Sequence, residues 1–396
     1  MSKIIFFSTP AHGHTNPTIP IVTELVLRGE EVFYFSIGEF EAKITSTKAI
    51  YQDYEFPGGF DPAVLGRNLA ELYFGLISIS KSILPRLLEK VKDINPDYII
   101  HDSIAVWGRY IATICKIPAI SSISTFAYSK KSLNFINTLK FIGQVKLDGL
   151  RKMIKARSLQ KELFKIYGVE PRLFIDTMMN EESLNIVYCS RAFQPRVEDF
   201  DSRKYKFLGP MISKRENDPD DTDYSKMKRP LIYISMGTVW KDQFNINTVI
   251  DALQDLSGSL VFSGDENDLE KPFHGENIFI RSHINQLEVL KYCDVFITHG
   301  GMNSVNEGLF FKVPLCVHSF QAEQEEVSNR IVKLKCGIRI NKLKKNAIHS
   351  AVQKVLKDKE MKNNCMKISD SFRESGGSKT AVDLILKHFK DYVYEE

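Results

Sequence analysis

Two histidines, His12 and His14, follow the apolar run KIIFFS in the segment STPAHGHTNP, residues 8–17. At this place a βα unit usually carries only a plain turn. An imidazole has an unperturbed pKa of ~6.5, so it is mostly neutral at pH 7 and can take a proton from a hydroxyl as a bond forms. The two rings therefore indicate acid–base chemistry directly after the first predicted strand.

The segment FITHGGMNSVNEGL, residues 296–309, has the composition of an anion site. A strand is predicted to end at Thr298, and the glycines after it let the backbone approach a ligand closely. A helix is predicted to begin near Met302, where unpaired N–H groups and the helix dipole favour negative charge. Further donors come from His299, Asn303 and Ser304. Together these features indicate a site for a diphosphate.

A plain structural interpretation of the same segment is equally open. Ser304 and Glu307 have the S-x-x-E spacing of a capping box, in which case the glycines serve only a tight turn. Alternatively, the Glu307 carboxylate lies one turn into the helix and accepts hydrogen bonds from both hydroxyls of a ribose.

The elements that must position these residues alternate between β-rich runs and amphipathic stretches. In the first half, strands are predicted at KIIFFS, EVFYFS, DYIIHD, IPAIS and LNIVYCS, and helices over 17–28, 68–93 and 103–115. In the second half, strands are predicted at PLIYISMG, GSLVFSG, NIFIRS, DVFITHG, VPLCVHS and CGIRI. The alternation predicts an α/β protein with two Rossmann-like parallel-sheet domains that face each other across a cleft. Ligands of such sheets bind beyond the carboxyl ends of the strands.

The chain has 396 residues, which is too long for one ordinary core, and 43% of them are hydrophobic. The polar stretch ISKRENDPDDTDYSKMKRP divides the two strand series. We therefore predict a first domain over 1–209, a linker over 210–229 and a second domain over 230–375. A C-terminal helix over 376–396 is expected to pack back on the first domain.

The composition argues against several classes of protein. The 53 basic and 49 acidic residues are nearly balanced, without the basic stripe of a nucleic-acid-binding surface. The six cysteines are far apart and show no zinc-finger spacing, which is typical of reduced thiols. No signal-peptide pattern and no apolar run of ~18 residues is found, so we expect a cytoplasmic protein without stable membrane insertion.

The motifs are similar to those of a known family. HGGMNSVNEGLFFKVPL followed by QAEQEEVSNRIVKLKCGI resembles the donor-site signature of family 1 glycosyltransferases, the GT-B enzymes that use UDP-sugars, and in particular the bacterial macrolide-type members. The likeness extends to SHINQLEVLKYCDVFITHGG, to IYISMGT and to the N-terminal FFSTPAHGHTNPTIPIVTELVLRGEEVFYFS. It covers nearly the whole chain and is weakest over 125–185.

The resemblance implies a donor site in the second domain. It implies that the uracil lies against His283, Ile284 and Gln286, where His283 and Asn285 stand in place of the family's usual aromatic residue and proline. It implies that the phosphates bind Gly237, Thr238, His299, Asn303 and Ser304, and that the ribose binds Glu307. The glycines that let the backbone approach this donor are Gly300 and Gly301. It implies that Glu323 and Gln324 bond the sugar hydroxyls, as in glucose-using members, although Ser319-Phe320 replaces the Pro-Gln pair of bacterial relatives. Outside this context the Glu323–Gln324 pair is an exposed polar helix start.

The resemblance also implies which histidine is the base. His14 matches the histidine of the family's GHxNP turn, and His12 then shapes the loop. Asp102, at the end of DYIIHD, matches the acidic partner, whose carboxylate would fix the imidazole tautomer and stabilise the cation. Without the resemblance, a strand-end aspartate is more often a cap. His101 should point to the opposite face of the sheet.

These implications combine into one functional hypothesis with alternatives. The chain is expected to be a monomeric, inverting, metal-independent hexosyltransferase without a cofactor, which uses a UDP-sugar, most of all UDP-glucose. The acceptor is expected to be a macrolide, polyketide or phenolic compound such as a flavonoid. The acceptor pocket is expected to be lined by Phe74, Phe126 and Phe135, which are equally compatible with core positions. DPDD at 218–221 matches a metal-binding DxD string but is interpreted as a solvated charge run. A GT-B sugar-nucleotide epimerase and a non-catalytic nucleotide-sugar-binding protein are the alternatives.

Overall fold

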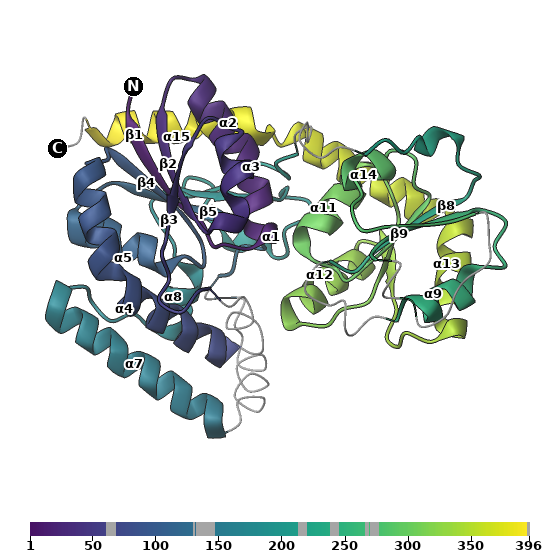
Figure 1. The fold of residues 1–396 in the computed structure, drawn as a ribbon, viewed down its shortest axis with the longest axis horizontal. Helices are drawn as coiled ribbons and strands as arrows, with labels where there is room; N and C mark the ends of the chain where they lie inside the picture. The colour runs from purple at the N-terminus through teal and green to yellow at the C-terminus, as the bar shows by residue number, and fades with distance from the viewer. Residues whose placement is uncertain are drawn as a thin grey trace. The chain divides into compact units, whose positions relative to one another are not determined.

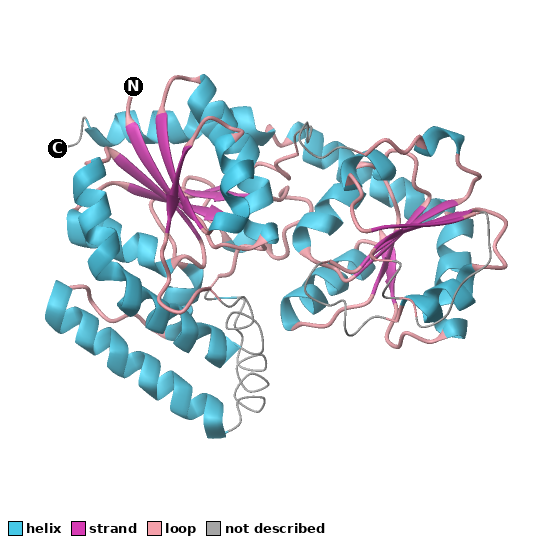
Figure 2. Ribbon diagram, viewed as in Figure 1, coloured by secondary structure: helices cyan, strands magenta, loops and turns pink. Residues whose placement is uncertain are grey.

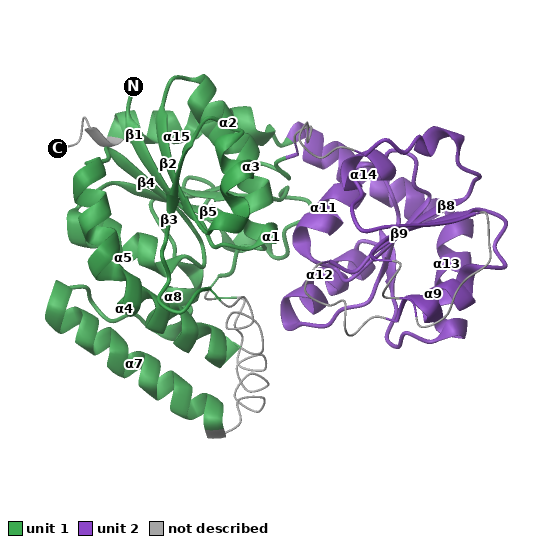
Figure 3. Ribbon diagram, in the orientation of Figure 1, with its two compact units in different colours: residues 1–211, 375–396 green, residues 212–374 purple. Residues whose placement is uncertain are grey.

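A computed structural model describes residues 1–60, 69–129, 131, 147–212, 220–237, 245–265, 269 and 277–393. The chain divides into two compact units, shown in Figure 3. Unit 1 comprises Met1–Met211 together with Ser375–Glu396, and unit 2 comprises Ile212–Glu374. Among the described residues, no helix has the length and apolar character needed to cross a bilayer.

Unit 1 is built on a seven-stranded sheet in the order β3-β2-β1-β4-β5-β6-β7, in which every pair of neighbours is parallel (Figure 1). The strands are β1 Lys3–Phe7, β2 Glu31–Ser36, β3 Ile50–Asp53, β4 Tyr98–Asp102, β5 Ala119–Ile123, β6 Asn185–Val187 and β7 Tyr205–Phe207. Since β1, β4 and β5 are adjacent, their carboxyl ends lie together at one edge.

Helices cover both faces of this sheet (Figure 2). They are α1 His12–Thr15, α2 Ile19–Leu27, α3 Glu41–Thr45, α4 Leu69–Ile94, α5 Val106–Cys115, α7 Leu147–Tyr167, α8 Phe174–Met179 and α15 Gly377–Val393, with short 3-10 turns at Asn16–Thr18, Gly38–Phe40 and Val197–Asp199. Strand alternation sorts the core into two layers. Ile5 and Phe7 pack with α4, α5 and α7, whereas Ile4 and Phe6 pack with α2, α3 and α15.

The C-terminal helix α15 belongs to unit 1 although it follows the whole of unit 2 in sequence. Its apolar side packs on α2 in the same core layer. Phe389 stacks on Tyr98 with ring centroids 3.9 Å apart, and Asp383 forms an ion pair with Arg28 at 3.0 Å. The last helix therefore ties the chain end to the sheet of unit 1.

Unit 2 has a six-stranded parallel sheet in the order β10-β9-β8-β11-β12-β13. Its strands are β8 Leu231–Ser235, β9 Ser259–Ser263, β10 Ile278–Arg281, β11 Val295–Thr298, β12 Leu315–Val317 and β13 Gly337–Arg339. Its helices are α9 Ile246–Leu253, α10 Gln286–Leu290, α11 Met302–Phe310, α12 Ala322–Lys333, α13 Lys345–Lys357 and α14 Lys359–Glu374, with a 3-10 turn at Tyr224–Lys226.

The predicted α/β class with two parallel sheets is confirmed, and the differences are local. The sequence pattern does not predict β3 and β7, which are the two outermost strands of the unit 1 sheet. β3 is only partly buried and ends in Gln52 and Asp53, so it lacks an apolar run. The predicted helix over 17–28 is preceded by α1 and a 3-10 turn with Pro17 at its start, and only α2 forms the longer helix.

Candidate functional site

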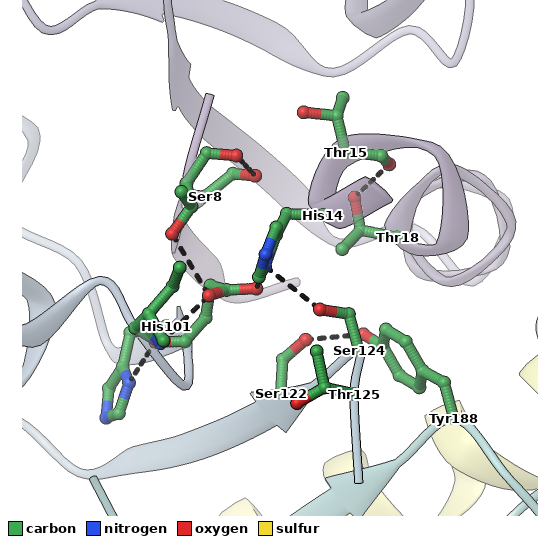
Figure 4. A network of polar contacts seen from close by, with 12 residues as sticks. Ser8, His14, Thr15, Thr18, His101, Ser122, Ser124, Thr125 and Tyr188 are labelled. Atoms are coloured by element: carbon green, nitrogen blue, oxygen red, sulfur yellow. Dashed lines mark hydrogen bonds and ion pairs between the residues drawn. The ribbon is translucent and has the colours of Figure 1, made fainter. Parts of the chain in front are cut away.

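His14 and Asp102 meet at the carboxyl edge of the unit 1 sheet. His14 lies in the short helix α1 just after β1, and Asp102 ends β4, the next strand in the sheet. The His14 Nδ1 atom lies 2.8 Å from Asp102 Oδ2. Ser124, which follows β5, places its Oγ 2.9 Å from the same nitrogen (Figure 4). Three neighbouring strand ends thus converge on one imidazole.

The hydrogen bonds determine which ring nitrogen of His14 can act as a base. A carboxylate accepts hydrogen bonds only, so the nitrogen that faces Asp102 must carry a proton. Nδ1 is therefore the protonated nitrogen, and proton acceptance falls to Nε2. The His14 side chain is 15% exposed and the Asp102 carboxyl is fully buried. The ring thus reaches solvent while its partner is shielded.

The Asp102 carboxylate is held on its other side as well. Its Oδ1 accepts a hydrogen bond from the Thr9 hydroxyl at 3.0 Å and another from the Ile104 backbone N–H at 2.9 Å. Both oxygens are therefore occupied by donors, as a buried carboxylate requires. The arrangement combines the two interpretations of a strand-end aspartate, because Asp102 caps its own turn with one oxygen and binds His14 with the other.

The other two histidines of this region have separate partners. The His12 ring is exposed and lies 2.9 Å from Glu39 Oε1, and it forms a T-shaped contact with the Phe40 ring. His101 is fully buried, and its Nε2 lies 3.1 Å from Glu182 Oε1. Arg109 also pairs with Glu182 at 3.1 Å. His101 and Asp102 thus use different partners on opposite sides of β4, as strand alternation predicts.

Sequence reasoning missed Ser124 and Thr9. Thr9 lies in the segment STPAHGHTNP but was given no role, and Ser124 lies outside the quoted motifs; both are small hydroxyl residues in the turn after a strand. The available signal was positional, since Thr9 follows the strand that leads to His14, and Ser124 follows the predicted strand beside Asp102. Strand order alone would have placed them within reach of the dyad.

In unit 2, the His299 ring is enclosed by two glycines at the carboxyl ends of adjacent strands β8 and β11. A Cβ atom on Gly301 would lie 2.5 Å from His299 Nε2, and one on Gly237 would lie 2.9 Å from His299 Cε1. Gly237 also has a φ of +74°. A Cβ on Gly300, with a φ of +89°, would meet the Val317 side chain at 2.7 Å. The glycines are therefore required by packing in addition to any approach of a ligand.

The Glu307 carboxylate, on the helix predicted to bind phosphate, is hydrogen-bonded to Gln286 of the segment predicted to bind uracil. Glu307 is 2% exposed; Gln286 Nε2 donates to its Oε2 at 2.6 Å, and Asn303 Nδ2 donates to its Oε1 at 2.9 Å. Helix α11 has Gly301 as its N-cap and no side-chain cap. The capping-box interpretation of Ser304 and Glu307 is therefore wrong, because Ser304 lies inside the helix.

Burial changes the expected charge of His299. It lowers the pKa of this imidazole to about 4, against a smaller opposite effect from the Ser235 backbone. His299 is therefore neutral at pH 7 and offers a ring N–H as a hydrogen-bond donor. A neutral imidazole supplies a hydrogen-bond donor and no positive charge. The glycine turn before α11 and the amides of its first residues are the candidate anion-binding elements.

This pKa predicts a pH dependence of stability. A histidine whose pKa falls from ~6.5 unfolded to about 4 folded takes up a proton on unfolding, so stability is complete above pH ~6.5 and is lost as the pH falls toward 4. The loss attributable to His299 should reach about 3 kcal/mol. Urea unfolding across this range should show a shallower pH slope in His299→Gln than in the wild type. Equal slopes would contradict the assignment.

The other residues predicted to bind the donor differ in their burial. Ile284 is buried, whereas His283 is exposed at the turn before α10. Gln324 is buried and its Oε1 accepts the Phe320 N–H at 2.9 Å, as part of a capping box with Gln321. The interpretation of Gln324 as an exposed polar residue is therefore wrong, while Glu323 is exposed. Thr238 lies outside the described residues.

The aspartate string in the predicted linker has a structural role. Asp220 Oδ2 accepts from the Tyr224 hydroxyl at 2.5 Å and from the Asn285 backbone N–H at 3.0 Å, and its Oδ1 accepts from the Thr222 N–H at 3.1 Å. Burial acts to raise the pKa of Asp220, but the hydrogen bonds outweigh it and keep this pKa below its ordinary value. Asp220 is thus a bonded anchor, which corrects the interpretation as a solvated charge at this position, while Asp221 is exposed. Asp218 and Pro219 of the DPDD string lie outside the described residues. No cluster of metal-ligating side chains occurs in the described residues.

The two predicted acceptor residues that the structure describes have different surroundings. Phe74 on α4 lines a cavity of about 440 Å³ between α4 and α7, together with Ser78 and Leu159. Phe126 is 3% exposed and packs on Phe193 with ring centroids 5.4 Å apart, which supports the alternative that it is a core residue. Phe135 lies outside the described residues.

Known proteins are similar to this chain both over unit 2 and over nearly its whole length. Residues 211–375 match the family described as UDP-glucoronosyl and UDP-glucosyl transferase. The chain is 30% identical over 405 residues to a Bacillus subtilis protein named as the uncharacterized UDP-glucosyltransferase YojK, with 98% of either chain covered. It is 33% identical over 386 residues to YdhE of the same species, also named an uncharacterized UDP-glucosyltransferase, with 94% and 95% covered. The crystal structure of the glycotransferase of kitacinnamycin superposes with a TM-score of 0.85 at 24% identity, covering 98% of this chain and 99% of that one, which confirms the predicted fold.

Proposed function

The chain belongs to the UDP-glycosyltransferase family, and from this membership we propose that it transfers a hexose, glucose in the first place, from a UDP-sugar to a hydroxyl of a small hydrophobic acceptor. The transfer is direct, inverts the anomeric carbon and needs no metal. The observation that carries the proposal is the contact between His14 and Asp102, 2.8 Å long at the carboxyl edge of the unit 1 sheet.

His14 is the general base of the proposed reaction. Its Nε2 takes the proton of the acceptor hydroxyl while the hydroxyl oxygen attacks the anomeric carbon and the bond to the UDP oxygen breaks. The imidazolium that forms keeps its Nδ1–H on Asp102, whose negative charge stabilises it. Ser124 Oγ, 2.9 Å from Nδ1, helps to hold the ring orientation. Because this step is a single displacement, no sugar becomes attached to the protein.

Unit 2 is the proposed donor site. The amides at the start of α11 and the neutral His299 ring would donate hydrogen bonds to the diphosphate. Glu307 would accept from the ribose hydroxyls, for which its carboxylate is already oriented by Gln286 and Asn303. Within the described residues Ser319 Oγ is buried and makes no hydrogen bond, and it lies beside the Gly300 turn. A bound donor would satisfy such a hydroxyl.

The acceptor and donor classes rest on resemblance. Both Bacillus relatives are named UDP-glucosyltransferases, which supports glucose. The macrolide-type motifs and the kitacinnamycin glycotransferase support a natural-product acceptor, such as a macrolide, a polyketide or a flavonoid-like phenol. A sugar-nucleotide epimerase or a non-catalytic binding protein would have no use for a base at the acceptor side, so the dyad favours transfer.

A panel of UDP-sugars and aglycones, analysed by mass spectrometry, tests this proposal. We expect one hexose to be added to at least one phenolic or macrolide acceptor, with UDP-glucose as the preferred donor. The rate should be unchanged in EDTA, because protein hydrogen bonds and the α11 dipole stabilise the leaving diphosphate. A strict requirement for a divalent ion, or a donor epimerised without transfer to any acceptor, would contradict the proposal.

A further inference from the structure

Helix α7 presents an unusual outer surface. Twelve large apolar side chains are exposed among the described residues, and four of them lie on α7. Leu150 is 52% exposed, Ile154 63% and Phe164 41%. Isolated exposed apolar residues are normal, whereas a concentration of them on one element marks an interaction site.

The geometry of α7 explains this exposure. Its inner side, with Ala156 and Leu163, packs against α4, and the Tyr73 hydroxyl of α4 donates to Gln160 at 3.2 Å. Figure 1 shows α7 as the outermost helix of unit 1, beyond α4 as seen from the sheet. Among the described residues, no helix or strand of unit 1 covers the side of α7 that faces away from α4.

The same side of α7 is strongly cationic. The helix contains six Lys and Arg residues against two acidic ones. The two acidic side chains, Asp148 and Glu162, are engaged by Lys152 and Lys81. In the part of the chain that the structure describes, Arg151, Lys161 and Lys165 form no ion pair and are exposed. We use the name α7 outer face for the surface formed by these three cations and the exposed apolar side chains Leu150, Ile154 and Phe164.

We propose that the α7 outer face docks unit 1 on the surface of an anionic lipid bilayer. Residues 150, 154, 161 and 165 share one side of the helix by their spacing, so apolar and cationic groups reach the same plane. A helix of this kind lies in the bilayer interface, with its apolar side chains at the headgroup boundary and its cations on anionic headgroups. The apolar side chains then leave water and the cationic side chains pair with anionic headgroups.

Two other occupants fit the surface less well. A second copy of the chain, related by a twofold axis, would place the same patch against itself and bring three cations against three cations. A nucleic acid would neutralise the cations but leave Leu150 and Ile154 without apolar contacts. An anionic membrane is the occupant that complements both the charge and the apolar area.

Vesicle sedimentation with the full chain tests the proposal. The protein should bind vesicles of phosphatidylcholine with about one third phosphatidylglycerol, should not bind phosphatidylcholine alone, and should dissociate as the salt concentration rises. The double variants Leu150→Gln/Ile154→Gln and Lys161→Gln/Lys165→Gln should each bind at least about tenfold more weakly. Glutamine preserves helix propensity, and all four positions are exposed, so folding should be retained.

Matched control variants distinguish binding through the α7 outer face from non-specific binding through any exposed apolar or cationic side chain. Leu27→Gln removes an apolar side chain that is 73% exposed on the same unit, and Lys354→Gln/Lys357→Gln removes two exposed cations from α13. Both controls should bind as the wild type does. Absence of binding to anionic vesicles, or equal binding by α7 and control variants, would overturn the proposal, as would a dimer that only the α7 variants dissociate. The assay uses no donor and no acceptor, so its failure would leave the transferase proposal unchanged.

Discussion

Replacing His14 with alanine should lower kcat at least about 100-fold, the usual effect of removing a general base. Without the imidazole, the acceptor hydroxyl must lose its proton to water during attack. The affinity for UDP-glucose should stay nearly unchanged, because all proposed donor residues belong to unit 2. Initial rates at saturating donor and acceptor, with titration calorimetry of the donor, measure the two quantities separately.

His12→Ala is the matched control for this prediction. His12 is two residues away on the same short helix, but its ring is 45% exposed and pairs with Glu39. Its loss should change kcat only a few-fold. Turnover near the wild-type rate in His14→Ala, or an equal loss in both variants, would remove His14 from the role of base.

Asp102→Asn should lower kcat by roughly 100-fold or more while the fold is retained. The Ile104 N–H donates to Oδ1, so the amide oxygen of asparagine must stay on that side. Its NH2 group then faces His14 Nδ1, which has to become the acceptor. The imidazole proton moves to Nε2, and Nε2 can no longer accept a proton from the acceptor hydroxyl.

The readout that separates this tautomer effect from a loss of structure is the pH profile of kcat, together with KM. KM for both substrates should change little, and the low activity should not recover at higher pH. Asp97→Asn serves as the control, since Asp97 lies just before β4 and bonds the Lys3 backbone N–H at 2.7 Å. A folded Asp102→Asn variant within a few-fold of the wild type would contradict the proposed role of the carboxylate.

Periodicity and composition were sufficient for the architecture of this protein. Alternating β-rich and helical stretches predicted two parallel sheets, because a strand buried on both faces must be apolar throughout and a covering helix must be amphipathic. The exceptions, β3 and β7, are edge strands that are short, and β3 is also partly exposed. β3 lacks the burial that produces an apolar pattern, whereas β7 is buried at Tyr205 and Phe207 but, with three residues, is too short to show a period.

The chemistry of the sites was predictable only as residue types near strand ends. Motif resemblance selected His14 over His12, and spacing placed Glu307 on α11. The hydrogen bonds that decide their chemical states join residues far apart in sequence: Asp102 with His14, Ser124 with His14, and Gln286 with Glu307. No local pattern contains those partners.

By itself, the sequence therefore determined which elements form and which reactive groups follow the strands, since both depend on local pattern and on the order of residues. The tertiary structure alone decided that His14 carries its proton on Nδ1, that His299 is neutral, that Asp220 is a bonded anchor and that the apolar side chains of the α7 outer face are exposed. These properties depend on burial and on hydrogen-bond partners that are far apart in the sequence. Strand register and helix packing bring such partners together only in the folded chain.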